Sequence, residues 1–239
     1  MNRVKELLKS GKTVVGTAGS VFEDNMSMLA NSGLDFILFD TQHSPVEVKQ
    51  YNRALQATSG AQASPLVRVS ANSADLICFA LDIGARGIVV PMVNTKEEAE
   101  AVIDCCYFSP VGHRSYTSKR VMRFGLEKDL KAMMNRTNDD LLVMPQIEDI
   151  KAYNNLDEIL TVDGINVFAG GPNDLAQSMG YPGEPNHPDC IKVTNEGTEK
   201  IHAAGKYRND DVMVSVDATL AVRDSVAAML KSGDGILPY

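Results

Sequence analysis

Short runs of apolar, mostly β-branched residues recur along the chain at intervals that fit one strand plus one helix. Each run is continuous rather than alternating with polar residues, which is typical of strands covered on both faces. The runs are TVVGTA (13–18), FILFD (36–40), PLVRV (65–69), GIVVPMV (87–93), LLVMPQIE (141–148), INVFAG (165–170) and VMVSV (212–216). They predict strands of a parallel sheet joined by right-handed helical crossovers.

The number of these runs favours a TIM-type barrel over an open doubly wound sheet. A chain of 239 residues has the length of a single α/β barrel domain. No GxGxxG follows the first run and no GxxxxGK[ST] occurs, so the nucleotide-binding open sheets lack their usual support. We therefore expect one domain, residues 1–239, with a TIM-type (β/α)8 barrel fold.

Composition excludes several classes of function. No apolar run approaches the ~20 residues that cross a bilayer. The chain has 31 acidic and 23 basic residues and no stripe of Lys and Arg with interleaved aromatics, so we expect no nucleic-acid partner. The opening MNRVKELLKSGK lacks the apolar centre of a signal peptide, and four cysteines show no disulfide or metal-finger spacing. These features predict a cytoplasmic protein that acts on a small molecule.

Two carboxylates follow neighbouring predicted strands. Gln146 and Glu148 lie two residues apart, so they share a face at the carboxyl end of one strand, and Asp174 lies just beyond the next strand. Because neighbouring strands are ~4.8 Å apart, Glu148 and Asp174 can hold one ion. Two carboxylates with open remaining positions suit Mg²⁺ or Mn²⁺. The alternative is that Glu148 caps the next helix and Asp174 starts a turn.

Further polar groups are predicted at the same end of the barrel. Arg68 ends an otherwise apolar strand, where it either binds an anion or forms a salt bridge with a neighbouring carboxylate. Glycine before a short helix lets backbone N–H groups approach a ligand, so we add Gly171, Pro172 and Asn173 to Gln146 and Asp174 as substrate-binding candidates. A metal, an arginine and an anion cradle together suit a 2-oxo acid.

The stretch ILFDTQHSP (37–45) ends a predicted strand and brings His43 to the same edge. Asp, Ser and Pro are ordinary turn residues, so a solvated turn is the alternative to an active-site loop. An imidazole with an ordinary pKa of ~6.5 suits proton transfer near neutrality. We therefore take His43 as the candidate general acid or base.

The chain resembles the HpcH/HpaI family of class II, metal-dependent pyruvate aldolases. The resemblance rests on DTQHSP, VRV, LDIGARGIVVPMVNTKEEAE, SPVGHR, QIED and FAGGPNDLAQSMGYPGEPNHP, and it covers roughly residues 1–206. It implies a (β/α)8 barrel, usually a homo-hexamer, that reversibly cleaves a 4-hydroxy-2-oxo acid to pyruvate and an aldehyde through a metal-stabilised enolate. Mg²⁺ or Mn²⁺, and also Co²⁺, are the implied cofactors.

The resemblance also assigns roles to individual residues. It implies that Glu148 and Asp174 hold the metal, that Arg68 binds the substrate carboxylate, and that His43 is the catalytic histidine with Asp82 as its partner. Asp82 lies near the end of a predicted helix, at the end of the barrel opposite the catalytic mouth. An Asp82–His43 partnership must therefore cross an interface between subunits.

Two departures from the family pattern bear on function. Many relatives have Glu where this chain has Gln42, and a barrel segment is missing because Ala203-Ala-Gly-Lys206 reaches Val212 after only five residues. We expect seven strands, with the wall left open between INVFAGG and VMVSVD, since a crossover needs at least ~10 residues. Another 2-oxo acid lyase or decarboxylase, a citrate-lyase-like enzyme, and an impaired barrel acting as a binding or assembly subunit remain alternatives.

Overall fold

The computed structural model describes residues 2–19, 23–44, 48–116 and 125–217, together with 220, 223–225, 227–228 and 231. The strands are β1 (Val14–Gly19), β2 (Phe36–Asp40), β3 (Ser64–Arg68), β4 (Gly87–Val90), β5 (Leu142–Ile147), β6 (Val167–Gly170), β7 (Tyr207–Arg208) and β8 (Met213–Asp217). The helices are α1 (Arg3–Lys9), α2 (Glu23–Ala30), α3 (Val48–Ala57), α4 (Ala74–Asp82), α5 (Lys96–Cys106), α6 (Leu130–Asp140), α7 (Ile150–Asn154), α8 (Leu156–Ile159), α9 (Pro172–Ser178), α10 (Pro188–Ala203) and α11 (Asn209–Val212).

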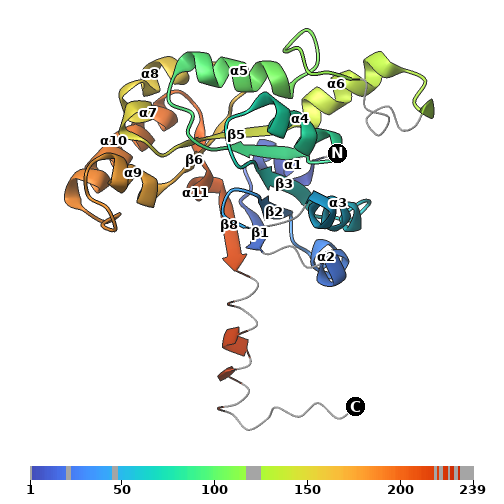
Figure 1. Cartoon of the computed structure of the whole chain (residues 1–239), viewed down its shortest axis with the longest axis horizontal. Coiled ribbons are helices and arrows are strands. Elements are labelled where there is room, and N and C mark those ends of the chain that lie inside the picture. The colour runs from blue at the N-terminus through green and yellow to red at the C-terminus, as the bar shows by residue number, and fades with distance from the viewer. Residues whose placement is uncertain are drawn as a thin grey trace.

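All eight strands run parallel in one curled sheet, in the order β7-β6-β5-β4-β3-β2-β1-β8 (Figure 1). Consecutive strands along the chain are neighbours from β1 to β7, and β8 returns to pair with β1. Each predicted apolar run overlaps one of these strands, so the parallel α/β prediction is confirmed. The sheet is an open half-barrel because β7 and β8, its two ends, do not pair with each other.

The expectation of seven strands is wrong, whereas the expected open wall is confirmed. Tyr207 and Arg208 form a two-residue strand that pairs with β6. α10 supplies the crossover from β6 to β7. The segment after α10 therefore has to contain only the two residues that pair with β6. The single turn of α11 then carries the chain across the gap to β8 (Figure 1). No crossover helix separates β7 from β8 because these two strands are not neighbours.

Side chains on the concave face of the sheet form the inner core. Val4 and partly buried Leu7 and Leu8 of α1 pack against it, so α1 covers the amino ends of the strands. The residues from the sheet are Val14, Phe36, Leu66, Val89, Leu142, Met144, Val167 and Ala169. Their alternation along each strand means that Arg68 and Gln146 also face inward.

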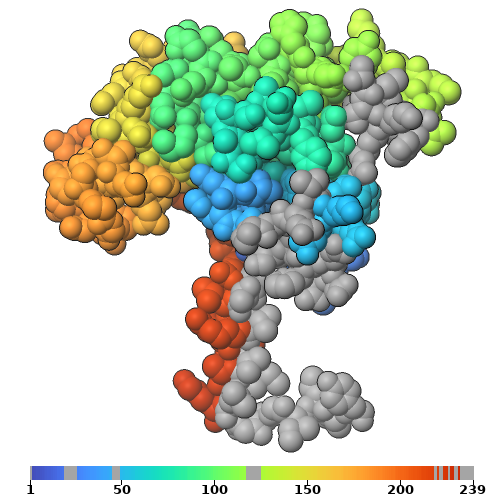
Figure 2. Space-filling model, viewed as in Figure 1, coloured from blue at the N-terminus to red at the C-terminus, as the bar shows by residue number. Residues whose placement is uncertain are grey.

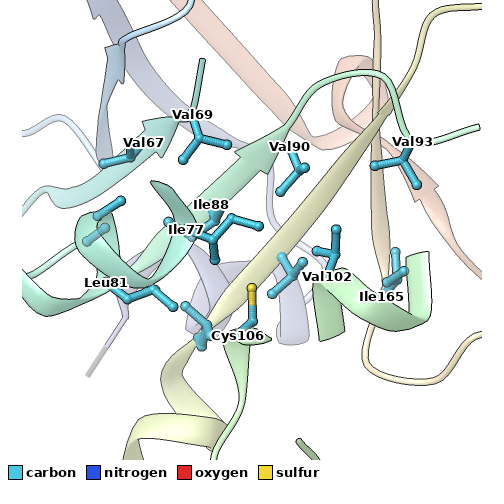
Figure 3. Packing of buried hydrophobic residues seen from close by; sticks show 14 of the residues in the cluster. Val67, Val69, Ile77, Leu81, Ile88, Val90, Val93, Val102, Cys106 and Ile165 are labelled. Atoms are coloured by element: carbon cyan, nitrogen blue, oxygen red, sulfur yellow. The ribbon is translucent and has the colours of Figure 1, made fainter. Parts of the chain in front are cut away.

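A larger outer core fills the space between the sheet and its helices (Figure 3). The labelled residues come from two strands, β3 and β4, from α4 and α5, and from neighbouring loops. They are Val67, Val69, Ile77, Leu81, Ile88, Val90, Val93, Val102, Cys106 and Ile165. Because the central strands are covered on both faces, their sequences are continuously apolar.

β8 is much less covered than the central strands. It follows α11 and extends from the main body of the molecule (Figure 2), and Val214 and Val216 are 48% and 43% exposed. All four cysteines are free. Within the described residues, no helix is both long and apolar enough to span a lipid bilayer.

Gly16 of β1 gives a test of inner-core packing. It lies opposite Phe36 in the β1–β2 register, and a Cβ atom at this position would overlap the Phe36 ring, which is buried. We expect Gly16→Ala to lower the free energy of unfolding by about 1–3 kcal/mol, because the ring must leave its packed position. Urea denaturation of Gly16→Ala in wild-type and Phe36→Leu backgrounds measures this coupling. An equal cost in both backgrounds would contradict the predicted overlap.

Candidate active site at the carboxyl ends of the strands

The Glu148 carboxylate follows β5 and is 2% exposed. Its Oε1 accepts a hydrogen bond from the Met92 backbone N–H at 2.9 Å, and its Oε2 accepts one from Gln146 Nε2 at 2.9 Å. Gln146 Nε2 also donates to the Gly170 carbonyl oxygen at 3.3 Å. These bonds tie the ends of β4, β5 and β6 together around one carboxylate.

Met92 presents its N–H to Glu148 from an uncommon backbone conformation. It has a φ of 56°, the only positive value among the non-glycine residues that the structure describes. A side chain larger than glycine is strained in this left-handed region. Strain of this kind persists where the surroundings enforce it, often at functional sites.

The environment of Glu148 shifts its protonation. Burial raises the pKa of this carboxyl group, and the negative charge of Asp174 adds to the rise. The Met92 N–H and the positive charges of Arg68 and of protonated His43 act in the opposite direction but do not cancel it. Glu148, Asp174, Arg68 and His43, predicted from separate segments, therefore share one electrostatic neighbourhood.

Asp174 reaches the site from the helix that follows β6. It lies in the first turn of α9, which begins with Pro172 after Gly171, and it is exposed. A Cβ atom at Gly171 would overlap Glu148 Oε2, so only glycine allows the chain to pass this close to the carboxylate. Pro172 and Asn173 are exposed beside Asp174. The proposed anion-binding role of this segment stays a prediction.

Arg68 forms the salt bridge that the sequence left open as an alternative. Its Nε donates to Asp40 Oδ1 at 2.9 Å and its Nη2 donates to Asp40 Oδ2 at 2.6 Å. Nη1 makes no hydrogen bond to any other described residue. Asp40 thus fixes the guanidinium at the mouth of the sheet and leaves one edge of it free for a ligand.

The same contacts control the charge of Asp40. Burial alone raises the pKa of this carboxyl group. The Arg68 hydrogen bonds, the backbone N–H groups of Gln42 and His43, and the positive charge of Arg68 outweigh burial and lower the pKa below its ordinary value of 3.8. Asp40 is therefore ionised and organises both Arg68 and the start of the loop that carries His43.

His43 is exposed, and its backbone N–H donates to Asp40 Oδ1 at 3.4 Å. The residues that follow Ser44, from 45 to 47, lie outside the described residues. Gln42 Oε1 is buried and has no hydrogen-bond partner in the described part of the chain. The loop after β2 thus brings an accessible imidazole to the mouth, as predicted.

Asp82 lies elsewhere in the subunit, as predicted. It is the last residue of α4, and the following chain enters β4 at Gly87 from its amino end. Arg114 Nη2 donates to Asp82 Oδ1 at 3.2 Å, and the Arg114 side chain is buried over the Phe108 ring. Within one subunit, the partner of Asp82 in the described residues is therefore Arg114, and His43 lies at the opposite ends of the strands.

The described residues fit a divalent cation held by two carboxylates. They contain no cluster of three or more His, Cys, Asp or Glu side chains able to hold a metal, so Glu148 and Asp174 would share the ion with water or substrate. Each Glu148 oxygen accepts a single hydrogen bond and keeps a lone pair for a ligand. Gln146 Oε1 is buried without a partner among these residues, and a metal-bound water or substrate would satisfy it.

Two functional contacts escaped the sequence prediction. Asp40 was visible at the end of its strand, but its pairing with Arg68 depends on the β2–β3 register, in which these two residues are opposite each other. The Met92 N–H depends on a backbone angle that the residue type disfavours. The proline before Met92 was the one local signal that β4 ends there.

The fold places polar and charged side chains at the carboxyl ends of the strands of an α/β half-barrel, which is where enzymes with barrel folds bind small molecules. Residues 20–235 match the family model described as HpcH/HpaI aldolase/citrate lyase. The chain belongs to this family.

Individual relatives agree with the family match. The chain is 36% identical over 223 residues to a 2-keto-3-deoxy-L-rhamnonate aldolase from Klebsiella pneumoniae, covering 92% of this chain and 81% of the relative. An HpcH/HpaI aldolase structure from Desulfitobacterium hafniense has a TM-score of 0.85 at 23% identity and covers 100% of this chain and 99% of its own. A citrate synthase structure has a TM-score of 0.81 at 26% identity and covers 98% of each chain. The aldolase relatives identify the chain as a carbon–carbon lyase.

The Asp40–Arg68 pair predicts a specific dependence of stability on pH. Because the folded state lowers the pKa of Asp40, ionised Asp40 stabilises the fold in full above its ordinary pKa of 3.8. That stabilisation is lost as pH falls through the lowered folded-state pKa. We expect Asp40→Asn to cost about 1–3 kcal/mol near neutral pH, less than a fully buried pair because both side chains are partly exposed.

Urea unfolding of wild type and Asp40→Asn at a series of pH values tests this expectation. The difference in unfolding free energy should be constant above pH 3.8 and should shrink below it. A difference that stays constant through the acid range would show that ionised Asp40 is not the source of the stabilisation.

Proposed function

We propose that this protein is a divalent-metal-dependent aldolase that reversibly cleaves a 4-hydroxy-2-oxo acid to pyruvate and an aldehyde. The observation that carries the proposal is the buried Glu148 carboxylate, placed by Met92 and Gln146 in one electrostatic neighbourhood with Asp174, Arg68 and His43. Glu148 and Asp174 would hold Mg²⁺ or Mn²⁺. The bound ion would supply positive charge beside the oxygen on which negative charge develops when the carbon–carbon bond breaks.

The chain's own groups account for substrate binding. Arg68 is oriented by Asp40 and has its Nη1 free among the described residues, so it suits the carboxylate of a 2-oxo acid. Gln146 Oε1 is a buried acceptor that faces no protein donor there, and it would hold a water or a substrate hydroxyl. Backbone N–H groups of Gly171 and Asn173 would contribute on the side of Asp174. Together these groups would orient the substrate before any bond breaks.

His43 would transfer the proton, since it is accessible at the mouth and its imidazole suits acid–base work near neutrality. Asp82 would assist it from a neighbouring subunit of a homo-oligomer. This assignment follows from position: Asp82 is at the far end of its own sheet, its Oδ1 accepts from Arg114, and its Oδ2 has no other partner within the described residues. A neighbour's His43 could approach that free oxygen.

The natural aldehyde partner is proposed from the relatives and from the open wall. The relatives named 2-keto-3-deoxy-L-rhamnonate aldolases make that sugar acid the first substrate to try. The gap between β7 and β8 leaves one side of the mouth without a strand, so we propose a wide, weakly selective aldehyde site. A cytoplasmic location agrees with the free cysteines.

The likeness to a citrate synthase favours one second candidate, an enzyme that joins an acetyl unit to a 2-oxo acid. A substrate panel separates the two. Pyruvate with aldehydes should give 4-hydroxy-2-oxo acids under the aldolase proposal, whereas oxaloacetate with an acetyl donor should give citrate under the alternative. Exchange of pyruvate methyl protons with solvent, followed by NMR, distinguishes the aldolase from an impaired barrel that only binds, and exchange of the acetyl donor's methyl protons does the same for the citrate-forming enzyme.

The metal site predicts the behaviour of two variants. Glu148→Gln and Asp174→Asn should each lose aldolase activity and bind Mn²⁺ at least about 10-fold more weakly, because one remaining carboxylate is too little for a labile hard cation. Mn²⁺ binding can be followed by electron paramagnetic resonance without substrate. Asp149→Asn is the matched control, since the Asp149 side chain caps α7 through the Lys151 N–H at 2.8 Å and takes no part in the site. Full activity of Glu148→Gln in the presence of chelator would exclude this metal site.

The shared site predicts complementation between subunits. His43→Ala and Asp82→Asn should each be inactive, and the second variant keeps an oxygen that accepts from Arg114. Mixed oligomers purified through two different tags should regain activity, because some sites then contain both native residues. Mixed oligomers of wild type and His43→Ala show how much activity a given fraction of intact sites produces. If the mixed variants are no more active than their parents, Asp82 does not act across an interface.

A further inference from the structure

The short strand β7 leaves a peptide of the active site without its normal strand partner. β6 runs from Val167 to Gly170, but β7 accompanies it only at Val167 and Phe168. After Arg208 the chain turns into α11. Gly170 therefore has no backbone neighbour on this side, although its own carbonyl and the following Gly171 lie against Gln146 and Glu148.

The ladder pattern shows which group is missing. The Tyr207 N–H donates to the Asn166 carbonyl at 2.9 Å. In a parallel ladder this hydrogen-bond pattern repeats every two residues along both strands. A longer β7 would therefore offer the backbone carbonyl of residue 209 to the Gly170 N–H. In the structure the same residue supplies a different oxygen: the Gly170 N–H donates to Asn209 Oδ1 at 3.2 Å. The Asn209 side chain thus stands in for its own backbone carbonyl.

Contacts around α11 hold Asn209 in this position. The Arg208 N–H donates to Asp211 Oδ2 at 2.8 Å, and the same oxygen is 2.7 Å from His202 Nε2 of α10. The Arg208 guanidinium packs against Gly170, where a Cβ atom would overlap it, and Asp210 Oδ2 accepts from Arg208 Nη2 at 3.1 Å. The turn after β7 is therefore fixed to α10 and to β6 on both sides of Asn209.

We propose that Asn209 is a positioning residue for the metal-binding carboxylate. It fixes the N–H of the Gly170 peptide unit while Gln146 fixes the Gly170 carbonyl, and this sets how closely Gly171 approaches Glu148. Asn209 touches neither substrate nor metal and acts through Gly170, Gly171 and Gln146. By this means the shortened barrel keeps the site geometry that a full strand would impose. The inference rests on the proposed function.

Three variants separate positioning from general stability. Asn209→Leu keeps the approximate size and removes the acceptor, so the dissociation constant for Mn²⁺ should rise about 10-fold. Asn209→Asp keeps an oxygen at the same place and should stay within about twofold of wild type. Asp157→Ala is the matched control because it removes an exposed ion pair, to Lys200 of α10, that involves none of the residues around Gly170. Activity lost by Asn209→Leu at low Mn²⁺ should return at high Mn²⁺.

Mn²⁺ binding by electron paramagnetic resonance and amide hydrogen exchange of Gly170 are the readouts. Wild type should protect the Gly170 N–H, and Asn209→Leu should lose this protection while the amides of β5 keep theirs. Equal Mn²⁺ affinity in wild type and Asn209→Leu would overturn the inference, and so would equal impairment of Asn209→Asp and Asn209→Leu. If Asn209→Leu does not fold, rapid exchange of the Gly170 N–H in wild type alone would overturn it. Wild type that neither binds Mn²⁺ nor exchanges pyruvate protons would instead refute the proposed function.

Discussion

The buried Glu148 carboxylate is the constraint on which the mouth of this barrel depends. Removing an ion from water costs several kcal/mol unless hydrogen bonds and nearby charges compensate. Here the Met92 N–H and Gln146 supply the hydrogen bonds, and the N–H is available only because Met92 adopts a φ of 56°. A strained backbone conformation lowers the free energy of unfolding by about 1–3 kcal/mol. The fold retains this strain at Met92, where the backbone N–H donates to the Glu148 carboxylate.

The charges at the mouth are arranged in two groups with different roles. Arg68 and Asp40 have opposite charges and form two hydrogen bonds with each other, which fix the orientation of the Arg68 guanidinium. Glu148 and Asp174 form no ion pair with any residue that the structure describes, and their mutual repulsion contributes to the raised pKa of Glu148. An added cation is the simplest way to relieve that repulsion.

Much of this site could be predicted from the sequence because parallel strands bring their carboxyl ends to one edge. That rule alone predicted Glu148, Asp174, Arg68 and His43 at one edge, and in the structure the charges of Asp174, Arg68 and His43 act on the pKa of Glu148. The identity of Asp40 as the partner of Arg68 could not be predicted. A single sequence does not say which residues of β2 and β3 lie opposite each other. Asn209 and Gly170, which form a hydrogen bond, are 39 residues apart in the sequence. In this bond a side-chain oxygen replaces a backbone carbonyl oxygen, and no sequence pattern indicates such a replacement. The expectation of seven strands rested on the minimum length of a crossover between residues 206 and 212. That length does not limit β7, because α10 precedes β7 as its crossover and β7 does not pair with β8.

The position of the gap explains why a shortened barrel can keep its site. In the sheet order β7-β6-β5-β4-β3-β2-β1-β8, the site residues follow β2, β3, β5 and β6, and both unpaired edges lie outside this set. The missing ladder bonds therefore fall on β7 and β8, and Val214 and Val216 of β8 are largely exposed. Only β6 borders a shortened neighbour, and there a single side-chain oxygen replaces the absent carbonyl. The half of the mouth formed by β2, β3 and β5 is built from strands with a neighbour on each side, so the missing pairing falls on the opposite half, and the strand that carries Glu148 keeps both of its neighbours.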